Sequence, residues 1–131
     1  MKVVCQNGVQ HNFTRKEAEA LVAALPVSLC KNVNTFGLGD GGTREPNVSY
    51  YPKERDLWLF WDAHSATNEE KAEVVELIIV ILSIIEEKGY CPQTVKSSLY
   101  REHANKRNSL IEKAQKALKF ATQQGPERRL A

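Results

Sequence analysis

Paired cysteines are missing from this chain of 131 residues. Its three cysteines, Cys5, Cys30 and Cys91, lie far apart, and no C-x-x-C motif occurs. A zinc knuckle and a thioredoxin-type dithiol both need such a pair, so we expect no bound metal and no cofactor. Free thiols are typical of a reducing compartment, which favours a cytoplasmic location.

Long apolar segments are missing as well. The longest one, residues 74–85, is interrupted by Glu76 and Ser83 and is shorter than the roughly 20 residues that cross a bilayer. The opening residues contain an apolar run of only three before Gln6, which is too short for a signal peptide. We therefore expect no membrane-spanning segment and no secretion signal.

What is present is typical of a folded chain. Hydrophobic residues make up 42% of the sequence and charged residues 26%, a balance that argues against intrinsic disorder. The length fits one domain. We predict a single domain over residues 1–124, followed by a loose tail at residues 125–131.

Short strands are predicted in the first half of the chain. An Asn-Gly dipeptide at positions 7–8 favours a tight turn, which makes residues 3–6 and 9–13 a hairpin. Further runs of strand-forming residues lie at 27–33, 48–51 and 57–61. Residues 37–43 are rich in glycine and are expected to form a loop between two strands.

Capping boxes mark the starts of three predicted helices. In this motif a Thr or Ser hydroxyl and the Glu carboxylate three residues later bond each other's backbone amides. The motif occurs at Thr14–Glu17, Thr67–Glu70 and Ser109–Glu112. The first helix is expected to end before Pro26, and the second at Gly89. A helical stretch from Pro92 is expected to break near residues 105–108.

The second of these helices defines the expected fold. It is apolar around most of its circumference from Val74 to Ile85, which is typical of a helix in the middle of a core. Strand 57–61 is apolar on both faces, so we expect it to be central or covered twice. We predict an α+β fold in which a small antiparallel sheet of four to five short strands packs against this helix, with a basic C-terminal helical segment.

Two patterns suggest a binding or catalytic site, but neither contains all the parts that such a site needs. Gly37 to Gly42 match G-x-G-x-x-G, but no helix that could bind a pyrophosphate is predicted after them. Asp62 and His64 could act as acid and base in a small hydrolase, which we keep as an alternative. No metal-ligand spacing is present, and we predict a protein that is not an enzyme.

The order of elements over residues 25–85 is loosely similar to that of very small zincin-like metallopeptidases. The likeness rests on residues 47–51, residues 57–59 and the helix that begins at Thr67. In that family the helix carries H-E-x-x-H, whereas residues 76–81 here contain no histidine. The resemblance implies a scaffold without the metal chemistry, and we do not assign the chain to the family.

Charge is distributed unevenly along the chain. The first 87 residues carry 8 Lys and Arg against 13 Asp and Glu, whereas residues 88–131 carry 10 against 3. The basic C-terminal third could bind a polyanion, or it could pack against the acidic part of its own chain. No motif for base-specific recognition accompanies it.

We therefore expect a small non-enzymatic interaction protein, such as a regulator, an inhibitor or an assembly subunit, that binds a protein partner. A second copy of the chain is one option for that partner. The main alternative is a nucleic-acid-binding protein that uses the basic C-terminal helices. The candidate contact residues are Lys106, Arg107, Lys113, Lys116, Trp58, Trp61 and Tyr50.

Overall fold

The computed structural model describes residues 1–6, 11–40, 44–62 and 66–123. These residues form β1 (Lys2–Cys5), α1 (Arg15–Ala24), a 3₁₀ helix η1 (Val27–Cys30), β2 (Thr35–Gly39), β3 (Asn47–Tyr51), β4 (Asp56–Phe60), α2 (Asn68–Lys88), α3 (Ser97–Lys106) and α4 (Asn108–Gln123). The predicted α+β class is confirmed. The predicted tail at residues 125–131 lies outside the described residues.

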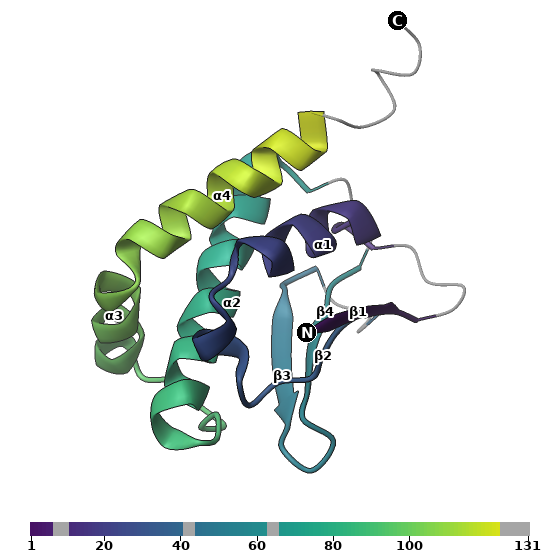
Figure 1. Ribbon diagram of the computed structural model, residues 1–131. Helices are drawn as coiled ribbons and strands as arrows, with labels where there is room; N and C mark the ends of the chain where they lie inside the picture. Colours follow the sequence, from purple (N-terminus) through teal and green to yellow (C-terminus); the bar gives the residue numbers. More distant parts are fainter. Residues whose placement is uncertain (7–10, 41–43, 63–65, 124–131) are drawn as a thin grey trace, which may run out of the picture.

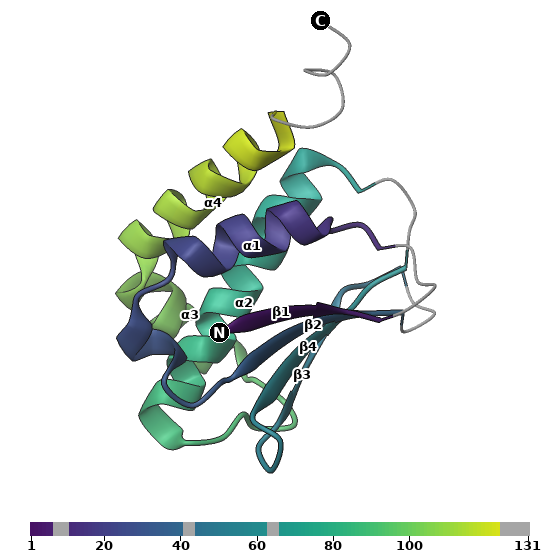
Figure 2. The ribbon, with the colours of Figure 1, turned by 45° about the vertical axis from the view of Figure 1, so that its right-hand side comes forward.

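The four strands form one mixed sheet in the order β1-β2-β4-β3 (Figure 2). β1 pairs with β2 and β2 pairs with β4 in parallel, whereas β3 and β4 are antiparallel. The expectation of an antiparallel sheet was therefore wrong for two of the three strand pairs. For β1 and β2 the reason is that the chain passes through α1 between them, and such a crossover returns a strand in the same direction. For β2 and β4 the reason is that the chain reverses twice, into β3 and again into β4, so that β4 runs in the direction of β2.

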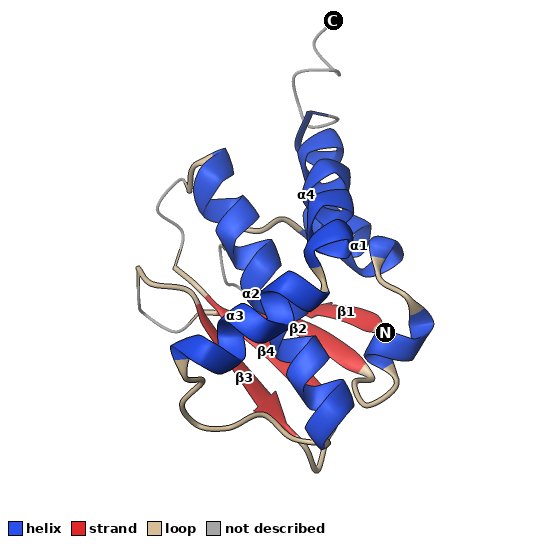
Figure 3. Ribbon diagram, turned by 90° about the vertical axis from the view of Figure 1, so that its left-hand side faces the viewer, coloured by secondary structure: helices blue, strands red, loops and turns tan. Residues whose placement is uncertain are grey.

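The helices lie on one side of this sheet (Figure 1 and Figure 3). α3 and α4 pack against α2, and α1 packs against α4 and β1. With the sheet on one side and helices on the other, α2 is buried around most of its circumference, as its apolar sequence predicts. No helix in the described ranges covers the opposite face of the sheet, and none is long and apolar enough to cross a membrane.

The capping boxes at the starts of α1 and α2 are confirmed, and the one predicted at Ser109 is wrong. The Thr14 and Thr67 side chains each cap their helix reciprocally with a glutamate, and α2 ends at Gly89, whose φ is 81°. Ser109 instead lies inside α4. Its cap is not needed, because the Arg107 carbonyl already accepts from the amide of Ile111 across the predicted break.

Two strands predicted in the N-terminal third are not formed. β1 exists, but its neighbour is β2, and residues 11–13 of the predicted hairpin partner are not a strand. Residues 7–10 lie outside the described ones. The 27–33 segment begins as a 3₁₀ helix after Pro26, and Val27 is 88% exposed, so its apolar residues do not line one face of a sheet.

Candidate interaction surfaces

The face of the sheet that points away from the helices carries two aromatic rings. Side chains alternate along a strand, so Leu57 and Leu59 of β4 point into the core while Trp58 and Phe60 point to the opposite side. The Trp58 and Phe60 rings are nearly parallel, at 14°, and their centroids are 6.0 Å apart. Both side chains are half-buried. This surface, the open face, consists of Lys2, Val4, Thr35, Gly37, Gly39, Asn47, Ser49, Tyr51, Asp56, Trp58 and Phe60.

Two glycines of β2 make room for these rings. A Cβ atom on Gly37 would lie 2.3 Å from the Trp58 ring, and one on Gly39 would lie 2.9 Å from the Phe60 ring. The rings therefore lie directly against the backbone of β2, a close approach that a side chain would prevent. The predicted loop was wrong for residues 37–39, which belong to a central strand, while residues 41–43 lie outside the described ones.

The open face carries little charge. Its two charged side chains, Lys2 on β1 and Asp56 on β4, lie in one cross-strand row on either side of Thr35. An apolar aromatic centre with a polar rim and few charges is typical of protein–protein interfaces. A nucleic-acid surface instead needs several cations to neutralise phosphates.

Trp61 and Tyr50 point away from the open face. Trp61 is fully buried, its ring packs edge-on against Phe13, and its Nε1 donates to the Arg44 carbonyl oxygen at 2.9 Å. Tyr50 packs against the core, and its hydroxyl donates to the Asn32 carbonyl oxygen at 2.7 Å. Trp61 is therefore inaccessible to a partner, and of the aromatic candidates Trp58 alone lies on the open face.

The four basic candidates lie in the helical layer: Lys106 ends α3, Arg107 follows it, and Lys113 and Lys116 belong to α4. Lys106, Lys113 and Lys116 are exposed, and within the described residues no ion pair to any of them is present. The Arg107 guanidinium instead donates to Glu86 of α2 at 2.7 Å. The basic segment thus pairs with acidic α2 at Arg107, while these lysines face solvent.

The residues considered for hydrolysis are only partly described. Asp62 lies two residues after the end of β4, and its carbonyl oxygen accepts a hydrogen bond from the Asn12 side chain. His64 belongs to residues 63–65, which lie outside the described ones, so the pair stays a prediction.

The list of candidate contact residues predicted from the sequence does not contain Phe60, Gly37 or Gly39, which are parts of the open face. Gly37-x-Gly39 and Trp58-x-Phe60 share the same spacing of two, which is what two neighbouring strands need to place rings over glycines. That matched spacing is the signal that could have identified the surface.

Comparison with known proteins gives no relative, because no family, no curated protein and no solved structure matches this chain.

Proposed function

We propose that this chain is an interaction protein of the assembly-subunit type, with no catalytic activity of its own, and that it binds its partner on the open face. The observation that carries the proposal is the nearly parallel pair of Trp58 and Phe60 rings, which lie over Gly37 and Gly39. Large aromatic side chains contribute strongly to protein interfaces. A strand that is apolar on both faces is usually covered on both, and a partner would supply the second cover.

The occupant that best fits the open face is a second copy of the chain, because the face complements itself. A two-fold axis that runs along β2 exchanges β1 of one copy with β4 of the other. Lys2 of each copy then faces Asp56 of the second copy, since both residues lie in the same row. The same axis brings the two Trp58 rings, which lie over Gly37, against each other in an aligned packing of sheets.

This dimer should be weak. Full burial of a large apolar side chain is worth about 1.5–3 kcal/mol, and these rings are already half-buried in the single copy. Association also costs translational and rotational freedom. We therefore expect a dissociation constant on the order of micromolar or weaker.

Sedimentation velocity over a dilution series tests the proposal. The wild-type chain should shift from dimer to monomer on dilution, and Trp58→Ser should be monomeric throughout. Lys2→Glu and Asp56→Lys should each weaken the dimer, and the double variant should restore it because the charges are exchanged. Lys113→Glu on the helical side is the matched control and should behave as the wild type.

Two results would contradict this assignment. One is a wild-type chain that stays monomeric at every concentration. The other is a dimer that survives Trp58→Ser, because its interface would then lie elsewhere.

A second candidate function is polyanion binding by α3 and α4. It is favoured by the exposed lysines 106, 113 and 116, and a face-to-face dimer would leave this helical layer on the outside. Fluorescence anisotropy with labelled duplex and single-stranded oligonucleotides should then show affinity that falls steeply with salt. Lys113→Glu combined with Lys116→Glu should weaken that binding. Trp58→Ser lies on the open face and should leave the affinity for the oligonucleotides unchanged.

A further inference from the structure

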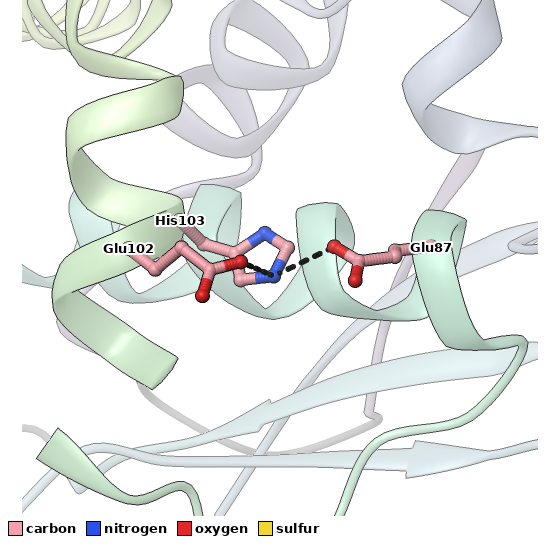
Figure 4. Close-up of side chains that lie close together, drawn as sticks. All are labelled: Glu87, Glu102 and His103. Atoms are coloured by element: carbon pink, nitrogen blue, oxygen red, sulfur yellow. Dashed lines mark ion pairs between the residues drawn. The ribbon is translucent and has the colours of Figure 1, made fainter. Parts of the chain in front are cut away.

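Two glutamates and a histidine meet where the end of α2 lies beside α3 (Figure 4). Glu87 belongs to the last turn of α2, and Glu102 and His103 are neighbours on α3. One atom from each, two carboxylate oxygens and an imidazole nitrogen, lie within 4.8 Å of one another. The cluster is on the helical side of the molecule and does not depend on the function proposed for the open face.

His103 is the member of the cluster that points to a ligand. Its side chain is fully buried, and within the described residues its Nε2 is the buried side-chain atom that has no hydrogen-bond partner. Nε2 lies 3.1 Å from Glu87 Oε2 and 3.9 Å from Glu102 Oε2, but the ring does not direct an N–H bond at either oxygen with hydrogen-bond geometry. Figure 4 shows Nε2 between the two carboxylates. Buried polar atoms are rarely left without a partner.

The other ring nitrogen is held by a buried hydroxyl. His103 Nδ1 lies 2.7 Å from Ser83 Oγ, and the Arg107 Nε–H donates to the same oxygen at 3.0 Å. A hydroxyl oxygen has two lone pairs, so it can accept from Arg107 and from the Nδ1–H together. In this tautomer Nε2 has a free lone pair on the side of the carboxylates. Metal-binding histidines are oriented in the same way, by an outer partner that accepts from the second nitrogen.

A cation is needed where this lone pair faces two carboxylates. A metal ion would bond all three ligand atoms at once. We propose that Glu87, Glu102 and His103 bind a divalent first-row transition metal ion, of which Zn²⁺ is the representative.

The distances suit such an ion. With bonds of roughly 2.0–2.2 Å to nitrogen and oxygen, two ligands of a tetrahedral zinc ion lie roughly 3.4 Å apart. The observed 3.1 and 3.9 Å lie on either side of that value. The Glu87 and Glu102 side chains are 43% and 64% exposed, so they can turn towards the ion while His103 stays fixed. A nitrogen ligand disfavours Ca²⁺ and Mg²⁺, which take oxygen ligands.

Titration of the full, tag-free chain with Zn²⁺ by calorimetry, and with Co²⁺ by visible absorption, tests the site. We expect one ion per chain and visible Co²⁺ d–d bands without the near-ultraviolet charge-transfer band of a thiolate ligand. Glu87→Gln and Glu102→Gln should each weaken binding by at least about tenfold, because even the loss of an outer-shell partner costs about that much. The matched control is Glu73→Gln, which changes an exposed glutamate of α2. This variant should bind Zn²⁺ as the wild type does.

The glutamate variants keep the test clear of folding defects, since His103→Gln changes a buried side chain. Thermal unfolding with and without Zn²⁺ gives the second readout, because a ligand that binds the folded chain raises its melting temperature. The rise should be as large in Glu73→Gln as in the wild type and clearly smaller in Glu102→Gln. The proposal is overturned if Zn²⁺ neither binds nor raises the melting temperature, if both glutamate variants bind as the wild type, or if a thiolate band shows that a cysteine is the ligand.

Discussion

The two faces of the sheet are built from the same strands, but different groups cover their backbones. On the covered face, Leu38 and Leu59 are 2% and 0% exposed because helices pack on them. On the open face, Gly37 has no side chain, and the Trp58 ring of the neighbouring strand lies over it. The ring itself stays half-buried.

This difference teaches that glycine in a central strand can serve packing across the strands. The usual cost of glycine in a strand is lost side-chain contact and greater chain entropy. Here the neighbouring strand supplies the contact, and the rings become a low, flat surface. The covered face is part of the core, while the open face is where we propose that a partner binds.

The largest expected effect is on the free energy of unfolding, and it differs between substitutions on the two faces of β4. Leu59→Ala should lower the free energy of unfolding by about 2–5 kcal/mol, because it leaves a cavity under the helices. Phe60→Ala should cost about 1–2 kcal/mol, since half-burial reduces the roughly 3–5 kcal/mol typical of a fully buried Phe. Urea unfolding at a low protein concentration measures both. Equal losses would mean that the open face is packed as firmly as the core.

Gly37→Ala should cause the next largest loss of stability. Its Cβ atom would lie 2.3 Å from the Trp58 ring, and displacing that ring should cost about 1–3 kcal/mol of unfolding free energy. In the Trp58→Ser background the same change should become neutral or stabilising, because alanine restricts the unfolded chain more than glycine does. A double-mutant cycle measures this coupling, and additive losses would show that the ring does not depend on the glycine.

The covered side has a polar anchor whose effect depends on pH. Glu17 is 2% exposed on α1; its carboxylate accepts from Lys71 of α2 at 3.0 Å and from Thr122 of α4. Burial alone would raise the pKa of Glu17. Hydrogen bonds from Thr122, the Thr14 amide and Lys71 outweigh it, so this pKa lies below the ordinary 4.5.

Glu17 therefore contributes stability that is complete above pH 4.5 and is lost as the pH falls through its folded-state pKa. Glu17→Gln should cost about 1–2 kcal/mol at pH 7 and should make the acid loss of stability less steep. Urea unfolding at several pH values measures both effects. An unchanged acid slope would show that the pKa of Glu17 is the same in the folded and the unfolded chain.

The smallest effect concerns His11, at the end of the covered face. Its Nδ1 accepts from the Phe13 amide at 2.9 Å, so Nε2–H donates to the Leu59 carbonyl oxygen at 3.1 Å. Burial lowers the pKa of His11 below 6.5, and this effect exceeds the opposite one of its backbone hydrogen bonds. The unfolded chain binds the proton more readily, so stability should decrease as the pH falls below 6.5.

We expect His11→Gln to flatten this part of the pH profile, because the variant has no imidazole to protonate. Chemical unfolding at pH 7 and pH 5.5 provides the measurement. A wild-type profile that is already flat between these values would contradict it.

The sequence predicts well where a signal is local. The capping threonines and Gly89 define the ends of α1 and α2 because each acts on residues within one helical turn. Strand 57–61 alternates as expected and is central. These local rules were enough for the α+β class.

Prediction fails where the deciding contact is distant in the chain. The glycines of β2 predict a loop when the sequence is considered alone. Their role in a strand is evident only in the folded chain, where the rings of β4 lie over them. Parallel pairing depends on crossovers rather than on composition. Likewise His103 shows no metal-ligand spacing, because Glu87 is on another helix and meets it only in the folded chain.

The turn between β3 and β4 has a consequence for the order of folding. Arg55 in that turn has a φ of 60°, and its carbonyl oxygen accepts from the Asn34 amide at 2.8 Å. Its guanidinium donates at 2.6 Å to the carbonyl oxygen of Lys31, which follows η1 and precedes the start of β2 at Thr35. The local β3–β4 hairpin can close first, and Arg55 then holds the start of β2 beside β4 in register. β1, whose partner is β2, must join last, and in hydrogen exchange its amides should open before those of the hairpin.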